Sequence, residues 1–172
     1  MKKLIIGISG KMGTGKSTVT NILVEALGKH RSERISLAKP IYNAQDALYK
    51  MYGLEMEGEK DRDLLIAIGL WGRNKNPDFW LDQLAKYAIE TDKEVLICDD
   101  VRFENEANFI DKVGFLIRID GEQRGSNVDI SRKEDPTECS LDTYNFKHRV
   151  SNTLSPEDMC KKIAKMLLKS AE

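Results

Sequence analysis

The chain has 172 residues, which is enough for one domain with a single hydrophobic core. Hydrophobic residues make up 41% of the sequence and charged residues 32%, as in an ordinary soluble globular protein. The 27 basic and 28 acidic side chains give a formal net charge of −1, so the sequence lacks the basic excess that accompanies nucleic-acid binding. Small anions are the expected ligands.

Cysteine usage and the N-terminal segment indicate the compartment. Cys98, Cys139 and Cys160 lack a Cys-x-x-Cys spacing, which argues against a disulfide scaffold or a zinc site and favours a reducing environment. The apolar run at residues 4–8 is too short for a signal peptide or a membrane span. We therefore expect a cytoplasmic protein without a membrane partner.

Short apolar runs alternate with helical periodicities along the chain. In chain order, they predict a strand at 3–8, a helix at 16–27, a strand at 34–37, helices at 41–53 and 62–73, a helix that begins with Asp78 as its N-cap, a strand at 94–98, a helix at 105–113, strands at 115–119 and 147–150, and a last helix that begins at Ser155-Pro156. Strands that alternate with helices imply right-handed crossovers and a parallel sheet covered on both faces. We therefore predict an α/β fold with three layers around a central parallel five-stranded sheet. The polar residues 121–135 predict a mobile loop.

A glycine-rich motif lies between the first predicted strand and the first predicted helix. Residues 10–17 match G-x-x-x-x-G-K-[ST], and a chance match somewhere in a chain of this length is roughly one in a hundred. The glycines let the backbone wrap a phosphate chain at a helix N-terminus, whose dipole favours anions. Lys16 would reach the β- and γ-phosphates, and the Ser17 hydroxyl would ligate magnesium. This P-loop motif therefore predicts binding of ATP and Mg²⁺ through Lys11, Met12, Gly13, Thr14, Gly15, Lys16, Ser17 and Thr18.

Two acids follow the strand predicted at 94–98. A P-loop site needs an acid at the end of a neighbouring strand to hold the magnesium, and Asp99 and Asp100 are the candidates. A capping role is the alternative for one of them. Arg102 lies two residues beyond Asp100 and can clamp an acceptor phosphate through two parallel hydrogen bonds. The alternative for Arg102 is a surface ion pair with Glu104 or Glu106.

Further short motifs are spaced along most of the chain. They comprise residues 36–40, Gly69 and Arg73 ahead of residues 78–80, residues 100–106, residues 136–138 and residues 150–154. With the P-loop motif, they resemble the deoxynucleoside monophosphate kinases encoded by bacteriophages, within the wider nucleoside monophosphate kinase group. The Asp-Val-Arg-Phe block that starts at Asp100 is the most specific of these motifs, although Glu104 follows it where that group commonly has proline.

The resemblance implies roles for individual residues. It places Arg102 on the acceptor phosphate, with further acceptor contacts at Lys39, Arg73, Trp80, Thr137 and Glu138. It places Asn152 near the adenine of ATP, and Asp100, helped by Asp99, at the magnesium. The loop 121–135 would be the kinase lid, in which Arg124 and Arg132 close over the transferred phosphoryl group. A core position is the alternative for Trp80, and a solvated position is the alternative for Lys39.

These features predict an enzyme that phosphorylates deoxynucleoside monophosphates to diphosphates with ATP. The prediction is a single P-loop kinase domain, residues 1–172, with a helical acceptor-binding region at about 39–92. Because the acceptor is already a phosphate, no general base is required, and catalysis consists of positioning and charge stabilisation by Lys16, magnesium and the lid arginines.

Two alternatives stay open at this point. One is another small-molecule P-loop kinase, of the phosphomevalonate or dephospho-coenzyme A type, and the other is a non-enzymatic P-loop switch. The arginines of the predicted lid favour a kinase, because a lid serves to exclude water. The accepted base, the accepted sugar and the oligomeric state stay open as well, although the resemblance suggests a homodimer.

Overall fold

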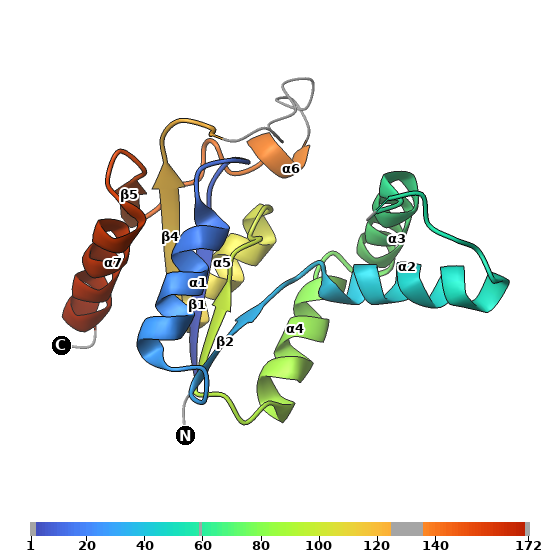
Figure 1. The fold of residues 1–172 in the computed structure, drawn as a ribbon, viewed down its shortest axis with the longest axis horizontal. Coiled ribbons are helices and arrows are strands. Elements are labelled where there is room, and N and C mark those ends of the chain that lie inside the picture. The colour runs from blue at the N-terminus through green and yellow to red at the C-terminus, as the bar shows by residue number, and fades with distance from the viewer. Residues whose placement is uncertain (1–2, 59, 125–135, 171–172) are drawn as a thin grey trace. The chain divides into compact units, whose positions relative to one another are not determined.

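The computed structural model describes residues 3–58, 60–124 and 136–170 (Figure 1). The chain forms two compact units, of which the first consists of residues 1–35 and 92–172 and the second of residues 36–91. The second unit nearly coincides with the helical region predicted at about 39–92. Residues 125–135 of the predicted lid, Arg132 among them, lie outside the described residues.

A parallel sheet forms the centre of the first unit. Within the described residues, its five strands are β1 (Leu4–Ser9), β2 (Ser32–Ile35), β3 (Val95–Cys98), β4 (Phe115–Asp120) and β5 (His148–Ser151). They lie in the order β2-β3-β1-β4-β5, and each neighbouring pair is parallel. β1 therefore lies in the middle, and the carboxyl ends of all five strands meet at one edge of the sheet. The predicted α/β fold with a parallel five-stranded sheet is confirmed.

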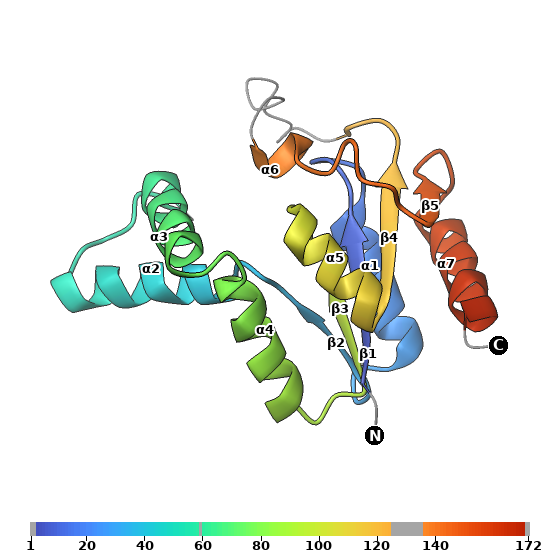
Figure 2. The ribbon, with the colours of Figure 1, turned by 180° about the vertical axis from the view of Figure 1, so that it is seen from behind.

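Helices cover both faces of this sheet. On one face, α1 (Lys16–Leu27) packs beside α7 (Pro156–Ser170), as Figure 1 shows. On the other face, α5 (Glu104–Val113) packs against β1 and β4 (Figure 2). The short α6 (Pro136–Cys139) belongs to the same unit. Among the helices of the described residues, none combines the length and the apolar composition needed to span a bilayer.

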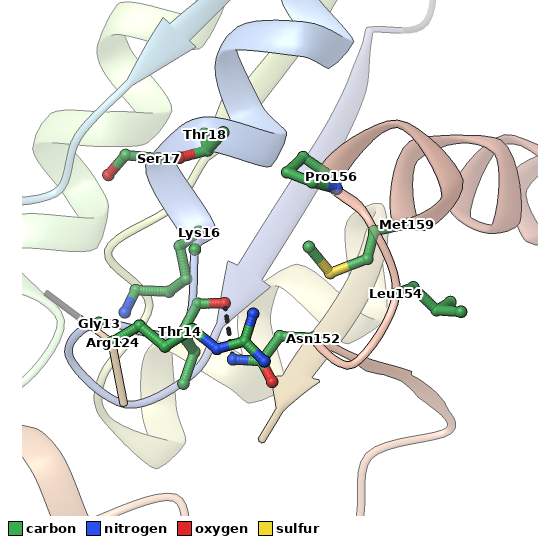
Figure 3. Close-up of a pocket in the computed structure, with 11 residues that line it drawn as sticks. Gly13, Thr14, Lys16, Ser17, Thr18, Arg124, Asn152, Leu154, Pro156 and Met159 are labelled. Carbon is green, nitrogen blue, oxygen red and sulfur yellow. Dashed lines mark hydrogen bonds between the residues drawn. The ribbon is translucent and has the colours of Figure 1, made fainter. Parts of the chain in front are cut away.

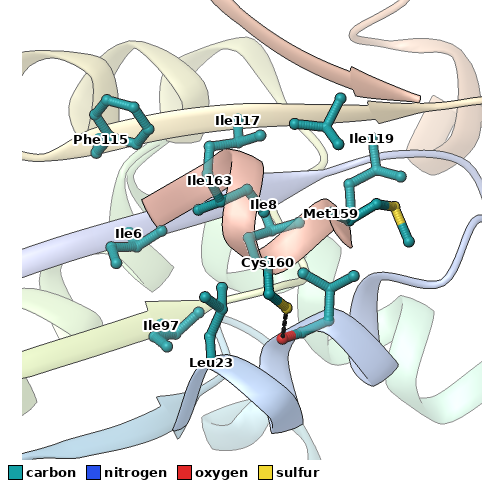
Figure 4. Close-up of a cluster of buried hydrophobic side chains, with 12 residues drawn as sticks. Ile6, Ile8, Leu23, Ile97, Phe115, Ile117, Ile119, Met159, Cys160 and Ile163 are labelled. Atoms are coloured by element: carbon teal, nitrogen blue, oxygen red, sulfur yellow. Dashed lines mark hydrogen bonds between the residues drawn. The ribbon is translucent and has the colours of Figure 1, made fainter. Parts of the chain in front are cut away.

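The main hydrophobic core lies under α1 and α7 (Figure 4). Ile6 and Ile8 point to this face, because successive strand residues alternate between faces, and both are fully buried. They pack with the other buried side chains of the cluster, Val19, Leu23, Ile97, Phe115, Ile117, Ile119, Val150, Met159, Cys160 and Ile163. On the opposite face, Gly7 is so close to Ile110 of α5 that a Cβ would come within 2.8 Å of its side chain. β1 is thus held on both faces, which fixes the position of the loop that follows it.

The second unit is helical. Its described residues form α2 (Lys39–Tyr52), α3 (Arg62–Lys75) and α4 (Phe79–Glu90). Asp61 caps α3, because one carboxylate oxygen accepts a hydrogen bond of 3.0 Å from the Leu64 N–H. The other oxygen accepts one of 2.8 Å from the Tyr49 hydroxyl in α2. From α4, the Trp80 indole N–H donates a hydrogen bond of 3.0 Å to the Gly69 carbonyl, so α3 holds both of its neighbours.

Two predicted elements begin two residues earlier than expected, for identifiable reasons. The strand predicted at 34–37 lies at Ser32–Ile35, because the Ser36 hydroxyl accepts a hydrogen bond of 3.1 Å from the Ala38 N–H and turns the chain. Pro40 fits the first turn of α2, so this helix begins at Lys39 instead of residue 41. Asp78 stands at the N-cap position of α4, as predicted, but its side chain makes no capping hydrogen bond within the described chain. The remaining boundaries agree within one or two residues.

Candidate nucleotide-binding site

The loop between β1 and α1 has the conformation of an anion-binding site. Gly15 precedes α1 with a φ of 91°, a left-handed conformation that residues with a side chain rarely adopt. Within the described residues, no side chain caps α1, and its first turn contains no acid. The partial positive charge of the helix N-terminus is therefore directed at the loop, where it favours a bound anion.

Lys16, the first residue of α1, folds back over the loop. Its Nζ donates hydrogen bonds to the carbonyl oxygens of Gly10, at 2.7 Å, and Lys11, at 2.8 Å. Burial, followed by the positive charge of Arg102, lowers the pKa of Lys16 from 10.5 to about 8, although the charge of Glu138 acts in the opposite direction. The ammonium group is thus largely desolvated, and a polyanion bound in the loop would stabilise its charged form.

A cavity of about 470 Å³ lies beside the loop (Figure 3). Its lining comes from the P-loop and the start of α1, from the segments that follow β4 and β5, and from the start of α7, and comprises Gly13, Thr14, Gly15, Lys16, Ser17, Thr18, Arg124, Asn152, Leu154, Pro156 and Met159. This volume is typical of small-molecule sites. The sequence predicts most of the lining but misses the apolar Leu154, Pro156 and Met159. Their position in the sequence could have indicated these three residues, because the chain after β5 leaves the sheet at the same edge as the P-loop.

Asn152 joins three segments at the wall of this cavity. Its Nδ2 donates hydrogen bonds to the carbonyl oxygens of Glu122, at 2.7 Å, and Thr14, at 3.4 Å. Gly121 has a φ of 137°, and a Cβ at this position would overlap Oδ1 of Asn152. The side chain therefore fixes the start of the predicted lid against the P-loop. The predicted position of Asn152 near the adenine of ATP stays a prediction.

Arg124 is the predicted lid arginine that the described residues include. Its backbone N–H donates a hydrogen bond of 2.9 Å to the Gly13 carbonyl, and its side chain lines the cavity (Figure 3). A guanidinium held beside the P-loop can neutralise phosphate charge.

A cation of the protein itself lies between two of the predicted magnesium ligands. Arg34, on β2, donates from Nε to Asp99 Oδ1 at 3.0 Å, and its Nη2 lies 2.9 Å from Asp99 Oδ2. The same Nη2 donates a hydrogen bond of 3.3 Å to the Ser17 hydroxyl. Asp99 is only 4% exposed, whereas Asp100 points elsewhere and accepts a hydrogen bond from the Cys98 thiol. Ser17 and Asp99 therefore already share a cation, and their hard oxygen atoms fit Mg²⁺.

Arg102 and Glu138 meet over the P-loop. Arg102 Nη1 donates a hydrogen bond of 2.9 Å to Glu138 Oε1, and the Met12 N–H donates one of 2.9 Å to Glu138 Oε2. The Glu138 side chain is 8% exposed. Glu106, one of the two ion-pair partners considered for Arg102, accepts hydrogen bonds from the backbone N–H groups of Arg102 and Phe103. The carboxylate of Glu138 is therefore bound by a P-loop N–H and by a predicted phosphate-binding arginine.

A second network that the sequence did not predict supports the P-loop. Arg118 on β4 is buried, and it donates hydrogen bonds to the Ser9 hydroxyl, at 3.1 Å, and to Asp142 Oδ1, at 3.2 Å. The other Asp142 oxygen accepts a hydrogen bond of 2.8 Å from Lys11 Nζ. Lys11, predicted to bind ATP, thus pairs with an acid from the segment after α6.

The remaining predicted acceptor contacts lie in the second unit and in α6. Lys39 begins α2 and is exposed, and Arg73 lies in the last turn of α3. Trp80 is 6% exposed and packs within the second unit, where it donates its hydrogen bond to Gly69. Thr137 lies in α6, directly before Glu138. The acceptor-binding roles of these residues stay predictions.

Comparison with known proteins relates the chain to kinases. A family model described as phosphomevalonate kinase matches residues 8–114, which is more than half of the chain. The "Uncharacterized protein ORF76" of Ictalurid herpesvirus 1 (strain Auburn) is 27% identical over 150 residues, which cover 81% of this chain and 57% of that protein. The chain therefore spans little more than half the length of this relative.

Several solved structures share the fold. Shikimate kinase from Aquifex aeolicus matches with a TM-score of 0.59 and 18% identity, over 98% of each chain. A gluconokinase from Sinorhizobium meliloti 1021 matches with a TM-score of 0.56 and 13% identity, over 99% of this chain and 96% of that one. The Mycobacterium tuberculosis APS kinase CysC matches with a TM-score of 0.52 and 12% identity, over 98% of each chain. At these identities the likeness is one of fold.

Proposed function

The chain belongs to the phosphomevalonate kinase family, and from this premise we propose that it transfers the γ-phosphoryl group of ATP to a small acceptor that already carries a phosphate. One observation carries the proposal. The P-loop lies at the carboxyl edge of the sheet, beside a cavity of about 470 Å³, and is surrounded by Lys16, the Ser17–Asp99 pair and Arg102. Cations and N–H groups gathered in this way suit a polyphosphate.

We propose a deoxynucleoside monophosphate as the acceptor. The Asp-Val-Arg-Phe block at Asp100 and the other motifs that resemble phage deoxynucleoside monophosphate kinases support this acceptor. The second candidate is phosphomevalonate, which the description of the matching family favours. Both acceptors are phosphate monoesters, so the same chemistry serves either.

The proposed reaction needs no general base. A phosphate oxygen of the acceptor attacks the γ-phosphorus, the bond between this phosphorus and the β–γ bridging oxygen breaks, and ADP leaves. An acceptor phosphate is largely ionised near neutral pH and is already a nucleophile. The protein therefore has to position the two phosphates and to stabilise charge on the transferred group.

Individual residues have distinct parts in this proposal. Lys16 neutralises the β- and γ-phosphates, and phosphate binding would restore the charge that burial disfavours. Arg102 exchanges Glu138 for the acceptor phosphate, and Arg124 neutralises charge from the side of the lid. Ser17 and Asp99 would hold Mg²⁺, which supplies charge neutralisation at the phosphate oxygens when it is bound.

A coupled assay of ADP release tests the proposal. The panel consists of deoxynucleoside monophosphates, nucleoside monophosphates and phosphomevalonate, each with ATP and Mg²⁺. We expect one deoxynucleotide to be phosphorylated, with turnover lowered ~10²-fold or more by Lys16→Ala. Phosphorylation of phosphomevalonate alone would select the second candidate. If no compound of the panel is phosphorylated and ATP is hydrolysed only slowly, the chain is a P-loop switch and the proposal is wrong.

A further inference from the structure

We infer that Arg34 is the resident counter-ion of the proposed magnesium site and has to leave Ser17 and Asp99 before Mg²⁺ binds there with the nucleotide. The inference rests on the proposed function, because it assigns Mg²⁺ to this pair of residues. It adds a residue that neither the P-loop motif nor the family resemblance points to.

The sheet topology delivers Arg34 to this place. β2 pairs with β3 in parallel, with Ile35 beside Cys98, so Arg34 and Asp99 leave neighbouring strands at the same edge of the sheet. Ser17 stands in the first turn of α1, a helix that contacts β2, and its hydroxyl lies 3.3 Å from Arg34 Nη2. A long side chain from β2 can therefore reach both the acid and the hydroxyl group.

Arg34 satisfies a carboxylate that cannot remain unpaired. Asp99 is 4% exposed, and a buried carboxylate without a partner is strongly destabilising. Arg34 Nε donates a hydrogen bond of 3.0 Å to Asp99 Oδ1, and Nη2 lies 2.9 Å from Oδ2 as an ion pair, although Oδ2 accepts no hydrogen bond within the described residues. With its bond of 3.3 Å to the Ser17 hydroxyl, the guanidinium binds Oδ1 and the hydroxyl oxygen and blocks the approach to the unpaired Oδ2, where a metal would bind.

Arg34 and Mg²⁺ cannot occupy these oxygen atoms together. Both are cations, and at hydrogen-bonding distances they would repel each other beside the buried Asp99 carboxylate. The Asp99 side chain is 3% exposed and has a fixed position, whereas the Arg34 side chain is 45% exposed and can swing into solvent. We therefore expect the arginine to yield, and the apparent affinity for Mg²⁺ to be reduced by the fraction of time that it occupies the site.

Calorimetry with a non-hydrolysable ATP analogue tests this inference without turnover. The measured quantity is the ratio of the analogue's affinities with and without Mg²⁺. If Arg34 occupies the site about nine-tenths of the time, this ratio is about tenfold larger in Arg34→Gln than in the unmutated protein. Arg34→Lys keeps the charge but loses the fork, so we expect a smaller increase, of about threefold.

Arg31→Gln is the matched control. Arg31 forms a similar pair with Glu94, at 2.9 Å and 2.7 Å to one oxygen, and lies at the other end of β2. We expect this variant to leave the ratio unchanged. Thermal unfolding without ligand gives a second readout, in which Arg34→Gln lowers the midpoint and Mg²⁺ alone restores part of the loss, because Asp99 regains a cation.

The outcomes separate the inference from its premise. A ratio that is unchanged or smaller in Arg34→Gln and Arg34→Lys overturns the inference, because Arg34 would then be neutral toward the metal or would position Asp99 for it. If the unmutated protein binds the analogue equally well with and without Mg²⁺, the proposed metal site is wrong and the inference is wrong with it. Phosphoryl transfer to the acceptor panel is measured separately and does not enter this ratio.

Discussion

The carboxylate of Glu138 accepts a hydrogen bond of 2.9 Å from the backbone N–H of Met12, within the P-loop. A carboxylate and a phosphate make the same kind of contact with such an N–H group, since both offer anionic oxygen atoms. The second Glu138 oxygen is bound by the Arg102 guanidinium. An internal anion thus holds two groups that the proposed reaction assigns to phosphates.

The first prediction concerns this internal anion. Because the Glu138 carboxylate lies where phosphate charge would accumulate, it has to withdraw when a triphosphate binds. Glu138→Gln removes its charge, and we expect the affinity for ATP without acceptor to rise about three- to tenfold. Titration calorimetry with the non-hydrolysable analogue measures this affinity.

Glu94→Gln provides the control for Glu138→Gln. Glu94 lies just before β3, at the edge of the sheet opposite the P-loop, where it pairs with Arg31. Glu94→Gln should therefore leave the affinity for the ATP analogue unchanged. A loss of affinity in Glu138→Gln would mean that the carboxylate positions Arg102 or the loop for ATP, and the prediction would then be wrong.

The second prediction follows from the lowered pKa of Lys16. With a pKa of about 8 in the free protein, Lys16 is about half deprotonated at pH 8, and a bound triphosphate would recharge it. We expect uptake of on the order of half a proton when the analogue binds at pH 8. Calorimetry in two buffers of different ionisation enthalpy measures this uptake, and Lys16→Met should abolish it. Equal proton uptake in the two proteins would contradict the prediction.

The same pKa has a consequence for stability, with a definite sign. The pKa of Lys16 is lower in the folded protein than its ordinary value of 10.5, so between pH 8 and 10.5 the unfolded chain binds more protons. The contribution of Lys16 to the free energy of unfolding therefore rises with pH across this window. Denaturant unfolding at several pH values should show this rise to be absent from Lys16→Met. A rise of equal size in both proteins would assign it to other groups.

The third prediction compares the two acids that follow β3. The family resemblance puts Asp100 first, but the structure brings Asp99 to the cation that also contacts Ser17. We therefore expect Asp99→Asn to raise the Mg²⁺ concentration needed for half-maximal transfer by about tenfold, and Asp100→Asn to raise it less. Initial rates at increasing Mg²⁺ give both values. The reverse order would return the metal to Asp100.

The sequence was sufficient for the fold because local and tertiary signals agree there. The run Leu4–Ser9 is almost wholly apolar, as a strand buried on both faces must be, and Gly15 marks the turn into α1. Strand limits were less certain where side chains compete with the sheet. At Ser36, a hydroxyl that bonds the Ala38 N–H ends β2 earlier than the apolar pattern indicates.

The site was only partly predictable, because its unpredicted members are set by strand order. Arg34 and Arg118 are charged residues inside strands, and nothing local distinguishes them from solvated side chains. Only the order β2-β3-β1-β4-β5 brings Arg34 beside Asp99 and Arg118 beside Ser9. The partnership of Glu138 with Met12 likewise depends on contact between segments 126 residues apart.

The fourth prediction tests the acceptor site. If Arg102 clamps the acceptor phosphate, Arg102→Ala removes a charge-assisted contact worth roughly 2–4 kcal/mol. We expect kcat/KM for the deoxynucleoside monophosphate to fall ~10²-fold, while the affinity for the ATP analogue without acceptor stays within about twofold. Arg102→Lys should recover little, because an ammonium group cannot reproduce the planar fork of the guanidinium.

Interpretation of the Arg102 variants depends on Glu138, because the two side chains are paired. Of the two contacts of the buried Glu138 carboxylate described above, loss of Arg102 leaves the one with the Met12 N–H. This change by itself could disturb the P-loop.

The double variant Arg102→Ala/Glu138→Gln removes that unpaired charge. If the loss of kcat/KM persists in the double variant, the arginine acts on the acceptor. If Glu138→Gln restores the rate, the arginine serves only to neutralise Glu138, and the clamp on the acceptor phosphate is wrong. A double-mutant cycle on kcat/KM measures this difference directly, because it isolates the coupling between the two side chains from the contact that each makes alone.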